Sequence, residues 1–297
     1  MLDLSHMTTE SRNPRTMGLD TLSPLELVTL MNQEDRAVAD AVAQVLPQVA
    51  QVVAWVTQSL GQGGRLIYLG AGTSGRLGVL DAVECPPTFG TPPSMVVGLI
   101  AGGEKAFVRA VEGAEDNLTL AEEDLKALAL SPRDTVIGVA ASGRTPYVIG
   151  GLAYARSLGC KTAAISCNRG SAMGKAADLA VEVVVGPEVL TGSTRLKAGT
   201  AQKMVLNMIS TASMVGIGKV YQNLMVDVLQ TNEKLHVRAE NIVIEATGVA
   251  RETARAAIDA ADGSVKTAIT MILADCGAPA ARARLEQAGG HVRKAIL

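Results

Sequence analysis

The glycine-rich segment YLGAGTSGRLG, at residues 68–78, has residue types and a spacing that suit ligand chemistry. Gly70, Gly72 and Gly75 match the pattern G-x-G-x-x-G, which here follows an apolar run and precedes a helical pattern. Glycines let the backbone N–H groups at the start of a helix approach a phosphate closely. Two ligands therefore compete for this turn: a dinucleotide held by its pyrophosphate, and a smaller phosphorylated molecule.

A dinucleotide site needs an acidic residue near the end of the second strand, about 20 residues after the glycines, to bind the ribose hydroxyls. The second apolar run ends in IAGG at residues 100–103, and Glu104 comes only after both glycines. The glycine spacing is therefore present without its ribose-binding acid. A turn for a single phosphate or for sugar hydroxyls fits better, with Gly72 admitting the ligand and Thr73 and Ser74 adding hydroxyl donors.

Similar turns follow later apolar runs. The turns AASGRTP and LTGSTRLKAGT contain Ser142, Gly143, Arg144, Thr145, Ser193, Thr194, Arg195 and Lys197. Open α/β sheets bind ligands at the carboxyl ends of their strands, so several such turns together predict a phosphosugar site. The cations suit a phosphate or a carboxylate, and arginine does so with two parallel hydrogen bonds. Taken singly, each hydroxyl could be a helix N-cap and each cation an ordinary surface charge.

The elements that must position these turns form an α/β pattern. Apolar runs that predict strands lie at 66–69, 95–100, 135–140, 162–166 and 179–185, with helical patterns at 74–83, 105–112, 118–128, 146–158 and 172–177. Continuous apolar strands alternating with helices predict a parallel five-stranded sheet flanked by helices on both faces, a Rossmann-like three-layer sandwich. The prolines of ECPPTFGTPP are expected to stop the first of these helices early.

Helices are expected on both sides of this region. Ser23 and Pro24 have the residue types of an N-cap and a first helical position, and Pro47 should kink or split the helical pattern over 35–60. A long apolar helical pattern covers 197–229, and only short helical patterns follow Asn232. We expect an N-terminal helical segment at 1–55, a phosphosugar-binding domain at 56–232 and a small C-terminal helical bundle at 233–297.

Composition narrows the function. The chain has 297 residues, 48% of them apolar and only 2% aromatic, with a net charge of −2. Such a chain has neither the charge nor the aromatic platforms typical of nucleic-acid binding, and it has no apolar run of the ~20 residues that cross a membrane. The start of the chain lacks the pattern of a secretory signal, and the four cysteines include no C-x-x-C pair, so a cytoplasmic protein with reduced thiols is expected.

Several longer stretches carry a more specific resemblance. The strand-end turns resemble the sugar isomerase (SIS) family of phosphosugar-binding domains. The segments GGRLIYLGAGTSGRLGVLDAVECPPTFG, VVGLIAGGEKAFVRAVEGAEDN, VIGVAASGRTPYV, LTGSTRLKAGTAQK and NLMVDVLQTNEKLHVRA resemble the family of N-acetylmuramic acid 6-phosphate etherases, over nearly the whole chain. The resemblance implies elimination of lactate from an open-chain phosphosugar and addition of water, giving N-acetylglucosamine 6-phosphate and D-lactate. It implies no metal or redox cofactor, and it implies a homodimer.

Two glutamates match the catalytic positions of that family. The resemblance implies that Glu84, in ECPPT, protonates the leaving lactyl oxygen and later handles the attacking water. Its apolar and proline-rich neighbours are expected to raise its pKa by desolvation. The resemblance implies that Glu115, in EGAED, is the second acid–base residue, and Asp116 is the rival for that role. Which carboxylate removes the proton at carbon 2 stays open, because both residue types can act as base or acid.

Two other functions compete with the etherase hypothesis. A phosphosugar isomerase would need the same phosphate turn and a base at carbon 2, but no acid over carbon 3. A non-catalytic phosphosugar sensor would need neither ECPPT nor EGAED. His236, in EKLHVRA, belongs to a region that in SIS domains can reach a partner subunit's site, although its residue type and position favour a structural or surface role.

Overall fold

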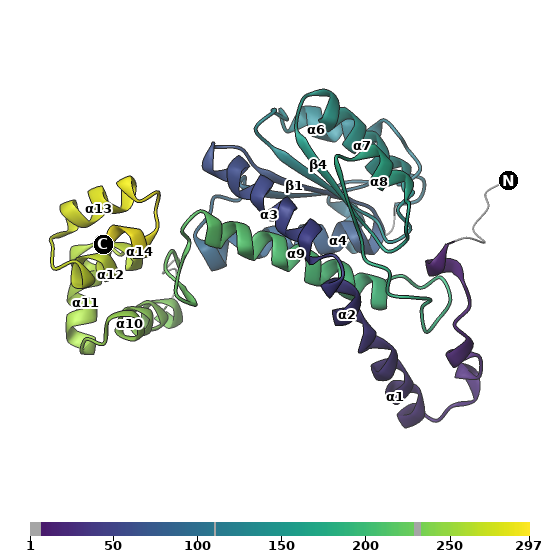
Figure 1. Cartoon of the computed structure of the whole chain (residues 1–297), viewed down its shortest axis with the longest axis horizontal. Coiled ribbons are helices and arrows are strands. Elements are labelled where there is room, and N and C mark those ends of the chain that lie inside the picture. The colour runs from purple at the N-terminus through teal and green to yellow at the C-terminus, as the bar shows by residue number, and fades with distance from the viewer. Residues whose placement is uncertain (1–6, 110, 229–232) are drawn as a thin grey trace. The chain divides into compact units, whose positions relative to one another are not determined.

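The structure, a computed structural model, describes residues 7–109, 111–228 and 233–297. The chain divides into two compact units (Figure 1). One contains residues 1–83 and 94–210, and the other contains residues 84–93 and 211–297. The sequence pattern predicted three domains that follow one another along the chain. In the structure, by contrast, the internal segment 84–93 belongs to the same unit as the C-terminal helices. The three-domain boundaries stay a prediction.

The first unit contains a five-stranded parallel sheet, as predicted. Its strands are β1 (Leu66–Gly70), β2 (Val96–Ile100), β3 (Thr135–Val139), β4 (Lys161–Ser166) and β5 (Leu179–Glu182). Their order is β2-β1-β3-β4-β5, and every neighbouring pair is parallel. The chain leaves β1 for one neighbour and later returns to its other side with β3. A crevice at the carboxyl ends of β1 and β3 is therefore the expected ligand position.

Helices cover both faces of this sheet. The helices of this unit are α1 (Pro24–Asp35), α2 (Ala37–Ala43), α3 (Leu46–Gly61), α4 (Gly72–Phe89), α5 (Lys105–Val108), α6 (Leu120–Ala127), α7 (Pro146–Ser157), α8 (Ala172–Ala176) and α9 (Lys197–Gly216), of which α4 and α9 continue into the second unit. Figure 1 shows α6, α7 and α8 on one face, and α3, α4 and α9 on the other. Alternate residues of β1 separate the faces: Leu69 packs toward Gly151 of α7, and Tyr68 toward Gly78 of α4.

The helical segment before the sheet begins as the sequence predicts. Short 3-10 turns at Thr8–Glu10, Pro14–Thr16 and Leu19–Thr21 lead into α1. Ser23 caps α1 with a reciprocal capping box to Glu26, and Pro24 takes the first helical position. The predicted break near Pro47 is confirmed, since α2 ends at Ala43 and α3 starts at Leu46. No single described helix is long and apolar enough to span a membrane; by length and composition, the bent pair 24–43 and 46–61 passes that test.

The second unit is mainly helical. It holds a small antiparallel pair, β6 (Val220–Tyr221) with β7 (Leu224–Met225), and the helices α10 (Glu233–Thr247), α11 (Arg251–Ala260), α12 (Val265–Leu273), α13 (Ala278–Gln287) and α14 (Val292–Ala295). Buried side chains of these helices, such as Val243, Ile258 and Ile269, form a core of their own. The expected small C-terminal helical subdomain is therefore present.

Two predicted helix ends were wrong. Helix α4 continues through Pro86 and Pro87 and ends at Phe89, within one turn after the prolines rather than before them. The long apolar helix ends at Gly216 rather than near residue 229, which lies outside the described residues. Gly218 there adopts a φ of 78° and is so close to Gly290 that a β-carbon would lie 2.7 Å from its carbonyl carbon.

Candidate functional site

The glycine turn after β1 combines close packing with an open surface. A β-carbon on Gly70 would lie 2.6 Å from the nitrogen of Gly75, and one on Gly75 would lie 2.7 Å from the Ile100 side chain. These two glycines allow the strand end to pack against the helix. Gly72 has a φ of 52°, is exposed and has no atom within 4 Å of its would-be β-carbon. It is the glycine that leaves room for a ligand.

The two hydroxyl residues of this turn have different surroundings. Ser74 is buried, and its Oγ donates a hydrogen bond of 2.9 Å to Oε1 of Gln202 in α9. This contact fixes the start of α4 against α9, so the Ser74 hydroxyl is engaged within the protein. Thr73 is half-buried, and its methyl group lies 3.7 Å from the position of a β-carbon on Gly199. The first turns of α4 and α9 therefore lie side by side.

A cavity of about 260 Å³ opens at the turn after β1. Its lining is Ala71, Gly72, Arg76, Ala101, Ala106, Val111, Glu112, Gly113 and Glu115. Arg76 was not singled out from the sequence. Its guanidinium donates to the carbonyl oxygens of Phe107 and Ala106, each at 2.8 Å, which holds the cation at the cavity wall. The signal available in the sequence was the position of Arg76, directly after the glycine turn and near the start of α4.

A second cavity, of about 290 Å³, opens at the turn after β3. It is lined by Glu10, Glu115, Asp116, Ser142, Arg144, Thr145 and Pro146. Gly143 has a φ of 70°, and a β-carbon there would lie 2.5 Å from Ser171, so only glycine fits between the turn and α8. Asn168 steadies the same turn by donating to the carbonyls of Ala141 and Ser142. The serine, arginine and threonine predicted here are therefore presented together.

Glu115 lines both cavities. Its own carbonyl accepts a 3.0 Å hydrogen bond from the Tyr147 backbone nitrogen at the start of α7, and its side chain is exposed. The loop that carries it therefore lies at the carboxyl ends of β1 and β3, where the topology places a ligand. Asp116, the rival residue, also lines the second cavity.

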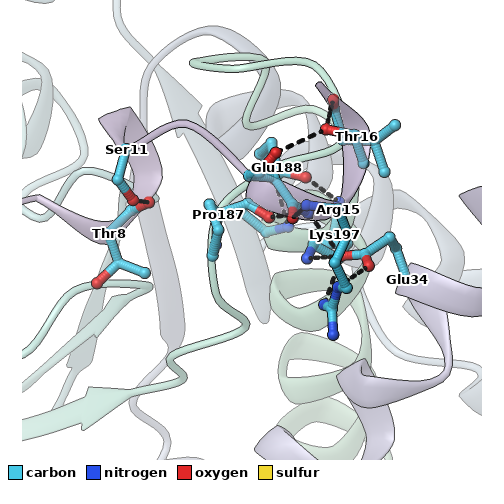
Figure 2. A network of polar contacts seen from close by, with 11 residues as sticks. Thr8, Ser11, Arg15, Thr16, Glu34, Pro187, Glu188 and Lys197 are labelled. Carbon is cyan, nitrogen blue, oxygen red and sulfur yellow. Dashed lines mark hydrogen bonds and ion pairs between the residues drawn. The ribbon is translucent and has the colours of Figure 1, made fainter. Parts of the chain in front are cut away.

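The turn before α9 contains four of the predicted binding residues. Ser193 and Thr194 are half-buried and Arg195 is exposed. Lys197 is different, since its side chain is only 1% exposed and its Nζ lies 2.9 Å from Oε2 of Glu34 (Figure 2). This buried ion pair gives Lys197 a structural partner. The charge of Lys197 is therefore matched within the protein, and we expect this lysine to make no contact with a substrate.

Glu34 is the centre of this buried network. It is 3% exposed and also accepts hydrogen bonds from Asn13 at 2.8 Å and from Arg15 at 2.9 Å. Burial alone would raise the pKa of Glu34. The hydrogen bonds from Lys197, Arg15 and Asn13 together lower it by more than burial raises it, so the pKa lies below its ordinary value. Nearby, the buried carboxylate of Glu188 accepts from the backbone nitrogens of Lys197 and Ala198, which caps α9.

Replacing Glu34 with glutamine should destabilise the protein by about 3–5 kcal/mol, because it leaves the Lys197 ammonium buried without a counter-charge. Urea unfolding measures this loss. As a control, Glu122→Gln removes an exposed ion pair with Lys126 and should cost only about 0.3–0.5 kcal/mol. Because the pKa of Glu34 is lowered on folding, its contribution is present at neutral pH and is lost as the pH falls through that pKa. A Glu34→Gln loss below 1 kcal/mol, or one that grows in acid, would contradict this assignment.

The remaining predicted residues belong to the second unit. Glu84 lies on α4 and is exposed, so the desolvation expected from its apolar neighbours is not present in this chain. His236 lies on α10, is exposed and lines a cavity of about 230 Å³ with Glu240, Arg255, Ile258 and Asp259. Glu240 there is bound to Arg255 at 2.7 Å.

Known proteins match this chain along its whole length. An N-acetylmuramic acid 6-phosphate etherase of Pectobacterium atrosepticum is 62% identical over 296 residues, which is 100% of this chain and 98% of that protein. One from Mycolicibacterium smegmatis is 61% identical over 99% of both chains. The chain belongs to the N-acetylmuramic acid 6-phosphate etherase family. The resemblance inferred from the sequence motifs is thereby confirmed.

Domain-level comparisons agree with the fold. The family model described as the N-terminal SIS domain of glucokinase regulatory protein matches residues 48–156, and the SIS domain model matches residues 117–212. A phosphoheptose isomerase from Francisella tularensis is 16% identical and aligns with a TM-score of 0.52, over 65% of this chain and 100% of its own. This chain therefore resembles that isomerase in fold. The α/β class with C-terminal helices is confirmed.

Proposed function

We propose that this protein cleaves the D-lactyl ether of N-acetylmuramic acid 6-phosphate, giving N-acetylglucosamine 6-phosphate and D-lactate. The observation that carries the proposal is the 62% identity, along the whole chain, to an etherase of this name. The enzyme is then a carbon–oxygen lyase of amino-sugar catabolism. Purified protein should release D-lactate from this substrate, whereas an isomerase or a phosphosugar sensor would release none.

The reaction is an elimination followed by a hydration. In the open-chain sugar the proton at carbon 2 is acidic, because it lies beside the aldehyde. A base removes that proton, a carbon 2–carbon 3 double bond forms, and the carbon 3–oxygen bond breaks with its electron pair going to the lactyl oxygen. An acid protonates this oxygen as lactate leaves. Water then adds to carbon 3, and carbon 2 regains a proton.

We assign the base to Glu115 and the acid to Glu84. The exposed position of Glu115 at both strand-end cavities supports its contact with a bound sugar. Glu84 is assigned from its place in the family motif ECPPT, and it must be protonated when the ether bond breaks. A pair of carboxyl groups in opposite protonation states can divide the work in this way.

The strand-end turns are proposed to hold the charged parts of the substrate. The open surface at Gly72, with Thr73, suits a phosphate at the start of α4. Ser142, Gly143, Arg144 and Thr145 form a second group, in which Arg144 suits a phosphate or the lactyl carboxylate. Ser193, Thr194 and Arg195 are proposed to complete the site from the turn before α9. The predicted absence of a metal and of a redox cofactor remains part of the proposal.

The assembly and the location are also proposals. The family resemblance implies a homodimer, and large apolar side chains on α1, such as Leu25 and Val28, are exposed in the single chain. The cytoplasmic location is proposed from the cysteine pattern, which suits reduced thiols. His236 is the residue proposed to reach a partner's site. Light scattering should give a mass of twice the 30.7 kDa protomer, and a monomer would contradict the dimer.

A further inference from the structure

The N-terminal segment at residues 8–16 supplies a side chain to the cavity after β3. Glu10 ends the first 3-10 turn, is half-buried and lines this cavity together with Glu115 and Arg144. Its Oε2 lies 3.4 Å from the position of a β-carbon on Gly192, in the turn before α9. The Glu10 carboxylate therefore adjoins both the second cavity and the turn that precedes α9.

Hydrogen bonds hold this segment against the carboxyl ends of the sheet. Thr9, one residue before Glu10, is paired twice with Asn168: its backbone nitrogen donates to Oδ1 at 3.4 Å, and Asn168 Nδ2 donates to its Oγ1 at 3.0 Å. The same Asn168 side chain donates to the turn that contains Ser142. One amide group thus couples the position of Glu10 to that of the predicted binding turn.

The other end of the segment is fixed by the Glu34 network. Asn13 and Arg15 bind the Glu34 carboxylate, and Thr16 Oγ1 donates to the Val189 carbonyl at 2.9 Å (Figure 2). The Glu34–Lys197 ion pair connects these contacts to the start of α9. A carboxylate held at both ends of its segment is preorganised, which is the condition for a specific ligand contact.

We infer that Glu10 is a substrate-binding residue that accepts hydrogen bonds from the neutral donors of the phosphosugar, its hydroxyls or its acetamido N–H. This inference rests on the proposed function. An ionised carboxylate has only acceptor atoms, and it repels both the phosphate and the lactyl carboxylate. Arg144 lines the same cavity and suits an anionic group. Glu10 would therefore bind a neutral part of the ligand, and Arg144 an anionic part.

The test compares Glu10→Gln with Asp20→Asn, which removes an exposed acid from the same N-terminal region. Asp20 lines a different cavity, which shares no lining residue with the cavity beside Glu10. Losing a charge-assisted hydrogen bond should lower kcat/KM of Glu10→Gln by about 10- to 100-fold, mainly through KM. The Asp20→Asn variant should match the native protein. Inhibition by N-acetylglucosamine 6-phosphate should weaken by a similar factor in Glu10→Gln, while inhibition by inorganic phosphate should stay unchanged.

The outcomes separate this inference from the proposed function. If native protein releases no D-lactate, the proposed function fails. If native protein is active but Glu10→Gln equals Asp20→Asn, the function stands and the role of Glu10 is wrong. If Glu10→Gln weakens phosphate and N-acetylglucosamine 6-phosphate inhibition equally, Glu10 supports the site as a whole, and the assignment to neutral donors is overturned.

Discussion

Glu84→Gln should lower kcat for D-lactate release by about 10²–10⁴-fold, the range that a positioned general acid contributes. Glutamine keeps the size and the exposed position of Glu84, but its amide can only donate a hydrogen bond and cannot transfer a proton to the lactyl oxygen. Without that proton the lactyl oxygen must leave as an alkoxide, which is a far poorer leaving group. The measurement is the steady-state rate of D-lactate formation, with thermal unfolding to show that the variant is folded.

Glu123→Gln is the matched control for this variant, because Glu123 is an exposed glutamate on helix α6. It should retain the native rate. Removal of the proton at carbon 2 does not need the leaving-group acid, so Glu84→Gln should still exchange that hydrogen with deuterated water when N-acetylglucosamine 6-phosphate is bound. Lactate release at the native rate would show that Glu84 is not the acid.

Glu115→Gln should have a comparable effect, about 10²–10⁴-fold on kcat, by a different step. A neutral amide cannot accept the proton from carbon 2, so both D-lactate release and deuterium exchange at carbon 2 should be lost. Loss of exchange in this variant, with its retention in Glu84→Gln, assigns base and acid separately. The two readouts are proton nuclear magnetic resonance of carbon 2 and the lactate assay.

Asp116→Asn tests the rival assignment, since Asp116 lies next in sequence and lines the same cavity. We expect Asp116→Asn to retain exchange at carbon 2. If it loses exchange while Glu115→Gln keeps it, the base is Asp116 and the role given to Glu115 is wrong.

The sheet could be predicted closely because its strands are buried on both faces. A strand in that environment is a short, nearly continuous apolar run, and Leu66–Gly70 and Thr135–Val139 differ from their predicted ranges by a single residue at one end. The end of α4 could not be predicted in the same way. Prolines lack the N–H that donates to the i−4 carbonyl and normally end or kink a helix, and nothing in the local sequence indicates that α4 includes Pro86 and Pro87.

The strand-end turns could be predicted as a group, because parallel topology brings their ends together. Individual roles within them depended on contacts that local sequence does not encode. The Ser74 hydroxyl donates a hydrogen bond to Gln202, and the Lys197 ammonium pairs with the Glu34 carboxylate. Both contacts join residues more than 100 positions apart, so no local spacing indicates them. For the same reason Glu10 was missed, since it reaches its cavity through the pairing of Thr9 with Asn168.

Oxygen-18 water tests the central claim, elimination of lactate and hydration of the sugar, most directly. The purified protein is incubated with N-acetylmuramic acid 6-phosphate in labelled water, and both products are examined by mass spectrometry with fragmentation to locate the label. We predict one labelled oxygen at carbon 3 of N-acetylglucosamine 6-phosphate and unlabelled D-lactate, because the carbon 3–oxygen bond breaks and water replaces it. Label in the lactate hydroxyl, with none at carbon 3, would place the cleavage on the lactyl side and contradict the account.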